Sequence, residues 1–176
     1  MKYQIIVMDP PWDYNNLQVS GNKKSKTGAI SHYQVMKTKD IYNEFKNYIN
    51  EISDDNCLIF MWTTAAFLEQ AILLGNQFGF KYVHMPFVWD KINHNPGFYT
   101  LNYCEFVLCF KKGKIPTPRG SRKEKQLVSI KRTKHSEKPD EVYNRIYNMF
   151  PTLNKLEMFA RKERKYFDVV GNEIKK

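Results

Sequence analysis

The feature that most constrains this chain is a short apolar run near its start that ends in two prolines. Residues 4–8 include the consecutive strand formers Ile-Ile-Val, a pattern typical of a strand buried in a parallel sheet. Proline has no N–H to donate to a neighbouring strand, and Pro11 restricts Pro10 to extended geometry. The strand must therefore end at Pro10, which places Asp9 at its carboxyl end.

The residues after this strand suggest a binding site for a flat base. Open α/β sheets bind their ligands at the carboxyl ends of the strands. Here Asp9 and the Pro10 carbonyl can accept the two N–H bonds of an exocyclic amine, and Trp12 can stack on the ring. An Asp-Pro pair alone is equally typical of a turn that ends a strand. The prediction therefore depends on Asp9, Pro10, Pro11 and Trp12 occurring together.

The rest of the chain alternates between predicted strands and helices. The spacing of apolar residues predicts helices at 38–52, 67–78 and 139–150 and further strands at 57–62, 81–91, 103–110, 155–161 and 166–173. Thr64 is expected to cap the second helix, Gly79 to end it, and Pro139 to be the first residue of the third. A turn-rich segment at 93–97 predicts that the strands on either side of it pair antiparallel at a sheet edge.

This order of elements predicts an α/β fold in one domain spanning residues 1–176. A strand–helix–strand–helix pattern gives a mostly parallel sheet with right-handed crossovers, helices on both faces and an antiparallel edge. The chain has 176 residues and is 42% hydrophobic, values typical of a globular domain rather than a disordered chain. The sequence shows no internal repeat.

Several classes of protein are disfavoured by the composition. No apolar run approaches the roughly 20 residues of a membrane span, and no charged-then-apolar leader opens the chain. Cys57, Cys104 and Cys109 lie in apolar stretches without Cys-x-x-Cys spacing, so we expect reduced core cysteines and no metal site. Together these features predict a cytoplasmic protein without membrane association.

The positive charge is concentrated in one segment. The net charge is +10, and residues 111–134 contain ten Lys or Arg and one Glu. A near-neutral protein with one basic segment is typical of a protein that binds the phosphates of nucleic acid. A solvated flexible loop is the simpler alternative, but it does not explain the asymmetry. We take 111–137 as this basic segment.

Two regions are expected to contact the nucleic acid. Residues 13–31 form a long polar stretch directly after Trp12, which favours a mobile loop over the active site, and Tyr33 just beyond it is a possible substrate contact. The predicted substrate-binding residues are Trp12, Tyr33, Lys111, Lys112, Arg119, Arg122, Lys123, Lys131 and Arg132.

The tetrad Asp9-Pro10-Pro11-Trp12 resembles the catalytic tetrad of the MT-A70 family, whose members methylate adenine N6. Four other segments resemble the same family. Residues 58–64 resemble its second core strand, 135–141 the segment whose Lys-Pro opens a helix beside the cofactor, 156–161 its cofactor strand, and 171–173 its closing Gly-Asn-Gln/Glu. The segments cover nearly the whole chain and occur in the family's order. The resemblance implies a permuted Rossmann-like methyltransferase fold, with the catalytic strand first and the cofactor half last.

The resemblance also implies a cofactor and the residues that hold it. The cofactor is S-adenosylmethionine, and the residues at matching positions are Asp9, Lys138, Glu157, Phe159, Arg161, Glu163, Asn172 and Glu173. The chain has no Gly-x-Gly loop, so side chains must hold the cofactor. Where the family often has a His-Asn pair for the ribose, this chain has Glu163 and Arg164. A carboxylate at Glu163 is still able to accept hydrogen bonds from ribose hydroxyls.

The function implied by the resemblance is methylation of adenine N6, with DNA favoured over RNA because the chain is a compact domain without added RNA-binding modules. RNA methylation is the nearest alternative. A different class is a catalytically silent nucleic-acid-binding subunit of a methyltransferase pair, which the intact tetrad disfavours. Relatives often pair, so a homodimer or heterodimer is also expected to be possible.

Overall fold

The structure is a computed structural model that describes residues 1–13, 35–95, 99–132 and 137–171. The elements in chain order are β1 (Tyr3–Met8), α1 (Thr38–Ile52), β2 (Ser53–Thr63), the short 3₁₀ helix η3 (Ala65–Phe67), α2 (Leu68–Gln77), β3 (Lys81–Asn95), β4 (Asn102–Lys112), β5 (Leu127–Ser129), α3 (Asp140–Met149), β6 (Lys155–Met158) and β7 (Asp168–Val170). Most of the predicted loop at 13–31 lies outside the described residues.

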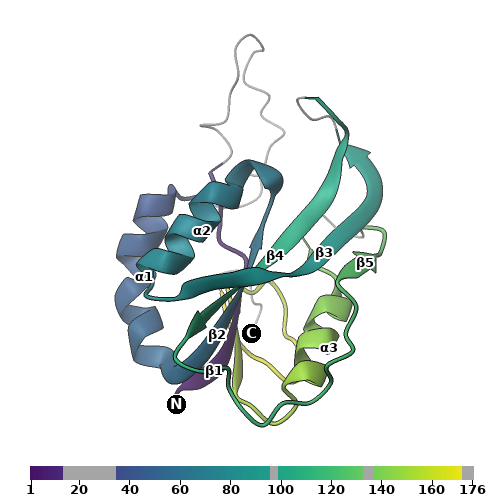
Figure 1. Cartoon of the computed structure of the whole chain (residues 1–176). Helices are drawn as coiled ribbons and strands as arrows, with labels where there is room; N and C mark the ends of the chain where they lie inside the picture. Colours follow the sequence, from purple (N-terminus) through teal and green to yellow (C-terminus); the bar gives the residue numbers. More distant parts are fainter. Residues whose placement is uncertain (14–34, 96–98, 133–136, 172–176) are drawn as a thin grey trace.

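The strands form one seven-stranded sheet in the order β5-β3-β4-β2-β1-β6-β7. Neighbouring strands are parallel except where β4 pairs antiparallel with β2 and with β3. The predicted antiparallel pair is therefore present on one side of the sheet, with the three-residue β5 outside it. Because all strands except β4 point the same way, their carboxyl ends meet at one edge, the upper edge in Figure 1.

Helices cover both faces of the sheet, as predicted (Figure 1). On one face, α1 and α2 bury Ile41 and Leu74 against side chains of β1 and β2. On the other face, α3 buries Val142 and Ile146 in a second cluster that includes Trp62. Strand β1 is buried on both faces from Ile5 to Met8, as its continuous apolar sequence requires.

The sequence predicted which helices and strands form better than it predicted the residues at which they begin and end. Gly79 has a φ of +85° directly after α2, a conformation that glycine adopts without strain and that ends helices. Thr64 holds the N-cap position of η3 but makes no capping hydrogen bond with its side chain, and Pro139 is the N-cap of α3 rather than its first residue. The prediction of a strand at 155–161 was too long. Strand β6 stops at Met158, because the next residue leaves the extended conformation with a φ of +61°.

Lys111 and Lys112 are strand residues at the end of β4, so the basic loop begins only at Gly113. The three cysteines are free; two are buried and Cys104 is half-buried. No helix in the described parts of the chain is long and apolar enough to cross a membrane. Those parts also contain no cluster of three or more His, Cys, Asp or Glu side chains suited to a metal ion.

Candidate active site

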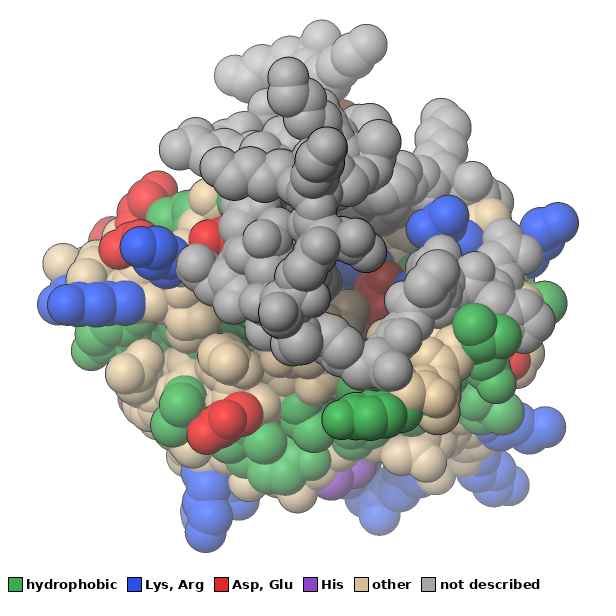
Figure 2. Space-filling model, turned by 90° about the horizontal axis from the view of Figure 1, so that it is seen from above, with side chains coloured by type: hydrophobic (Ala, Val, Ile, Leu, Met, Phe, Trp, Pro, Cys, Tyr) green, Lys and Arg blue, Asp and Glu red, His purple; other side chains and the backbone are tan. Residues whose placement is uncertain are grey.

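Asp9 lies at the carboxyl edge of the sheet between two parallel neighbours. Met8, the last residue of β1, pairs in register with the residue before Trp62 in β2 and with the residue before Phe159 at the end of β6. The three strands therefore bring Asp9, Trp62 and Phe159 to the same edge. This is the position at which open α/β sheets bind ligands, and Figure 2 looks down on it.

The Asp9 carboxylate belongs to a row of four alternating charges. The Lys138 ammonium lies 3.1 Å from Asp9 Oδ1 and 2.7 Å from Glu105 Oε2. The other Glu105 oxygen, Oε1, lies 3.3 Å from Lys91 Nζ. The four side chains are 10–15% exposed, so each charge depends on its neighbours for stabilisation. Lys138 is held further by the face of Trp62, whose ring centre lies 5.3 Å away.

The surroundings of Asp9 and Glu105 shift their pKa values in opposite directions. Burial raises the pKa of Asp9 above its ordinary value; Lys138 lowers it, and the negative charge of Glu105 raises it further. Burial also acts to raise the pKa of Glu105, but the two lysines hold it below its ordinary value. Burial thus prevails over Lys138 at Asp9, whereas the two lysines prevail over burial at Glu105.

A second buried network lies beside the first and is centred on Arg164. Its Nε donates to Glu157 Oε2 at 3.0 Å, while Tyr143 Oη donates to Glu157 Oε1 at 2.6 Å. Nη1 of Arg164 donates to Asp140, and Nη2 donates to the Lys138 carbonyl at 3.3 Å. The guanidinium lies 3.7 Å from the centre of the Tyr143 ring. Arg164 thus connects β6, α3 and the Lys138 backbone.

Glu157 is already engaged within this network. Burial raises the pKa of Glu157 to about 7, opposed by the hydrogen bond from Tyr143. Each of its oxygens accepts a hydrogen bond from a protein donor. Glu157 therefore holds Tyr143 and Arg164 together beside the site. Its contact with a cofactor stays a prediction, because each carboxylate oxygen keeps a further lone pair.

The Pro10-Pro11 unit fixes the chain as it leaves the sheet. The Pro10 carbonyl accepts a hydrogen bond from the Trp12 N–H at 2.8 Å, and the Pro11 carbonyl accepts one from the Met36 N–H at 2.8 Å. Trp12 and Met36 also form an isolated bridge. The chain therefore leaves and re-enters the described fold at one place. One of the two lone pairs of the Pro10 carbonyl is therefore already used, and the other remains able to accept.

Trp12 lies within the core. It is 3% exposed, its indole N–H donates to the Trp62 carbonyl at 3.1 Å, and its ring stacks on Phe67 with centroids 5.4 Å apart and an interplanar angle of 21°. Phe67 occupies one face of the ring, so the predicted stacking of a base on Trp12, which stays a prediction, would have to use the other face. Sequence reasoning did not anticipate Phe67 in that position.

Phe159 stands out among the predicted cofactor residues because its backbone is left-handed, with a φ of +61°. Non-glycine residues rarely adopt this conformation, and it is often found at functional sites. Arg161, two residues on, is half-buried and acts on Asp9 electrostatically. Glu163 is exposed, and Asn172 and Glu173 lie outside the described residues.

The predicted substrate lysines of β4 lie at the opposite end of the sheet from Asp9. Lys111 and Lys112 pair with Leu58 and Cys57, near the amino end of β2 and several residues before Trp62. Lys112 Nζ is 2.6 Å from Ser53 Oγ and packs over the Phe80 ring. The structure therefore separates these two lysines from Asp9. The sequence placed them in one basic segment, but a strand and a loop divide it.

The other predicted basic residues fall into two groups, while Tyr33 is outside the described residues. Lys131 and Arg132 follow β5, which is parallel to β3, so they lie on the side of the sheet where Asp9 lies. Arg119, Arg122 and Lys123 lie near the C-terminal end of α3, where Ser121 N–H donates to the Asn148 carbonyl at 2.7 Å. The predicted basic residues therefore lie in separate places, and Figure 2 shows several Lys and Arg side chains around the rim of the upper face.

Sequence reasoning missed the side chains that organise the site. Glu105 had a visible signal, because it is the one charged residue within the apolar run 103–110. Arg164, Tyr143 and Lys91 had none, since their partners come from distant parts of the chain.

The fold and the edge at Asp9 define a Rossmann-like α/β protein whose first strand delivers an acid to the ligand-binding position. Residues 3–173 match the MT-A70 family, and the chain belongs to that family of Rossmann-like methyltransferases. It is 44% identical over 185 aligned positions to the Type II methyltransferase M.MunI of Mycoplasma sp, an alignment that covers 98% of this chain and 78% of that protein. The family and this relative support methyl transfer to nucleic acid as the general reaction.

Proposed function

We propose that the protein transfers a methyl group from S-adenosylmethionine to the N6 amine of adenine in DNA. The observation that carries the proposal is Asp9, a largely buried carboxylate at the carboxyl edge of the sheet with Lys138 3.1 Å from one of its oxygens. The backbone that follows it is fixed by two prolines and their hydrogen bonds.

Asp9 acts in this proposal as a hydrogen-bond acceptor for the amine. The N6 lone pair of adenine is delocalised into the ring, so the nitrogen is a poor nucleophile. A carboxylate and a backbone carbonyl that accept its two N–H bonds orient the amine and localise the lone pair. Lys138 supports the ionised form of Asp9, and the second lone pair of the Pro10 carbonyl remains able to accept.

The described residues fit S-adenosylmethionine as the donor, which supplies the methyl group. The cofactor carries an anionic carboxylate, a cationic sulfonium and an aromatic base, and this edge offers both Lys138 and Arg161 as cations and Asp9 as an anion. Two buried donors nearby, Trp62 Nε1 and Thr64 Oγ1, have no hydrogen-bond partner among the described residues. Buried polar atoms of this kind are expected to meet a ligand or water. Asn172 and Glu173 remain proposed ribose contacts.

DNA is proposed as the polynucleotide because the chain is similar to a Type II methyltransferase over nearly its whole length. The positive charge of the chain suits a phosphate backbone. The adenine must leave the base stack to reach an edge as enclosed as that of Asp9. Lys131 and Arg132, which follow β5 on the same side, are the proposed phosphate contacts near the reacting base.

The test compares Asp9→Asn with Asp40→Asn, the same substitution at an exposed acid of α1. Methyl transfer is measured on duplex DNA, single-stranded DNA and RNA, and the product is identified as N6-methyladenine by mass spectrometry. We expect Asp9→Asn to lose activity by a factor on the order of 10²–10³, as for removal of one preorganised polar contact to a reacting group, and Asp40→Asn to retain it. Equal activity of the two variants would exclude the role of Asp9, and a preference for RNA would exclude DNA as the substrate.

A further inference from the structure

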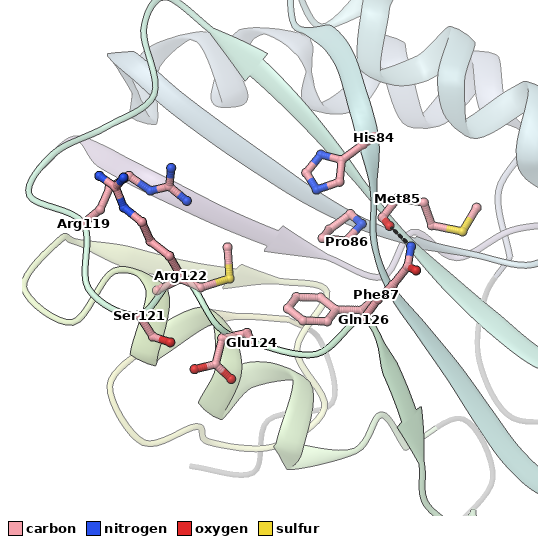
Figure 3. A pocket seen from close by; sticks show the side chains of 10 residues that line it. His84, Met85, Pro86, Phe87, Arg119, Ser121, Arg122, Glu124 and Gln126 are labelled. Atoms are coloured by element: carbon pink, nitrogen blue, oxygen red, sulfur yellow. Dashed lines mark hydrogen bonds between the residues drawn. The ribbon is translucent and has the colours of Figure 1, made fainter.

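A hollow of about 220 Å³ lies away from Asp9, between β3, the loop 113–126 and the C-terminal end of α3. Figure 3 shows Arg119 and Arg122 on the loop at one side and His84 on β3 at the other. Ser121 and Glu124 also line it, together with apolar side chains such as Phe87. The volume is below that of most drug-sized pockets, so it suits a small group rather than a whole nucleotide.

The backbone that carries the two arginines is fixed. Gly120 N–H donates to the Met149 carbonyl at 2.8 Å, and Ser121 N–H donates to the Asn148 carbonyl at 2.7 Å. Farther along the loop, Arg145 donates to the Lys125 carbonyl at 2.6 Å. Arg119 and Arg122 therefore extend from an anchored turn, which reduces the entropy lost when a ligand is bound.

The arginines of the hollow form no ion pair with the described residues. Within the described parts of the chain, neither Arg119 nor Arg122 has an acidic group within ion-pair distance, although Arg119 lies over the Phe150 ring at 5.8 Å. Glu124 is the acidic side chain that lines the hollow. In contrast, the buried Arg164 contacts two carboxylates. A pair of uncompensated guanidinium groups is a typical site for a phosphate, which they bind through planar, paired N–H donors.

The hollow is separate from the reaction site. The ten residues of α3 span about 15 Å along the helix axis, with Lys138 near its beginning and the arginine-bearing turn at its end. A polynucleotide whose adenine lies at Asp9 must therefore continue along α3 for its backbone to reach the hollow.

We propose that the hollow formed by Arg119, Arg122 and His84 binds one backbone phosphate of the polynucleotide, several nucleotides from the methylated base. This inference rests on the proposed nucleic-acid substrate and adds a second, independent anchoring point to it. The hollow serves affinity and register, while the chemistry takes place at the edge formed by Asp9.

The test is the salt dependence of duplex binding by the full chain. Arg119→Gln, Arg122→Gln and the double variant are compared with Lys2→Gln/Lys39→Gln, which removes two exposed charges elsewhere. If both arginines bind one phosphate, each single variant reduces the slope of log K against log salt by about 0.9 and weakens binding roughly tenfold. The double variant is then little worse than either single one. An unchanged slope, or an equal fall in the control, overturns the proposal.

Two further measurements separate the possible outcomes. Inorganic phosphate is titrated into the parent chain, and binding of phosphate without any change of the duplex slope in the arginine variants would assign the hollow to a free anion and overturn the proposal. Methyl transfer by the parent chain is measured at low salt in parallel. Duplex binding that depends on the arginines, without transfer, would support the hollow and reject the proposed reaction.

Discussion

The charges around Asp9 and those around Arg119 differ in burial and in pairing. Beside Asp9, acids and bases alternate and are largely buried, and each lies within 3.3 Å of an opposite charge. At the hollow, two exposed arginines have no acidic partner in the described parts of the chain. Buried charges must be paired because desolvation is costly, whereas exposed charges remain free to bind an external ligand. The charges beside Asp9 are thus compensated within the protein, whereas those at the hollow are available to an external anion.

The largest effect is expected from Arg164→Met, which removes the cation at the centre of the second buried network. Breaking a buried ion pair by deleting one partner typically costs about 3–5 kcal/mol, here because Glu157 and Asp140 lose their shared donor. The free energy of unfolding is measured by urea denaturation. Lys165→Met, at an exposed neighbouring cation, is the matched control and is expected to change stability little.

The same variant has an expected pH dependence. The raised pKa of Glu157, about 7 in the folded protein, means that its ionised form is disfavoured by folding. The contribution of Glu157 to the free energy of unfolding is fully present below its ordinary pKa near 4.5 and is lost as the pH rises through 7. The penalty of Arg164→Met should therefore be larger at pH 8 than at pH 5. A penalty independent of pH would show that Glu157 is not the group left unpaired.

An intermediate effect is expected from Glu105→Gln, which removes one acid from the row beside Asp9. The negative charge of Glu105 raises the pKa of Asp9, so its removal lowers that pKa. Because the proposed reaction needs the Asp9 carboxylate, the acid limb of the pH–rate profile should move to lower pH. Glu44→Gln, at an exposed position of α1, should leave the profile unchanged. A shift to higher pH would contradict the assigned coupling.

The smallest effect on stability is expected at the hollow. Arg119→Gln and Arg122→Gln remove exposed cations without an acidic partner in the described chain, so each should change the free energy of unfolding by no more than about 0.5 kcal/mol. Thermal and urea denaturation test this directly. A loss of several kcal/mol would show that the arginines are structural, and the contrast between the two regions would then fail.

The sequence predicted those features of the fold that depend on a local pattern of residues. The apolar run of β1 and the prolines after it place Asp9 correctly, and the spacing of apolar residues identified the three helices and the faces they cover. The partners of Asp9 depend instead on tertiary register. Glu105 reaches Lys138 because β4 runs antiparallel to β2, and no local pattern connects positions so far apart.

The spatial division of the basic segment was missed for a similar reason. Residues 111–134 are rich in Lys and Arg, but β4 ends at Lys112 and carries its two lysines to the amino end of β2. The loop then passes the end of α3 before β5 turns back toward the active edge. The basic residues are therefore close together in the sequence but far apart in the fold. The burial of Trp12 was missed because a tryptophan that follows a strand is compatible with either a core or a ligand contact.

The bridge between Trp12 and Met36 bears on which part of the chain can change in length. Because the chain leaves and re-enters the fold at one fixed point, the segment between them can change in length with little effect on the rest. Doubling the length of a flexible connection costs only about 0.6 kcal/mol of closure entropy. Insertions between these two residues are therefore expected to leave the edge at Asp9 in place.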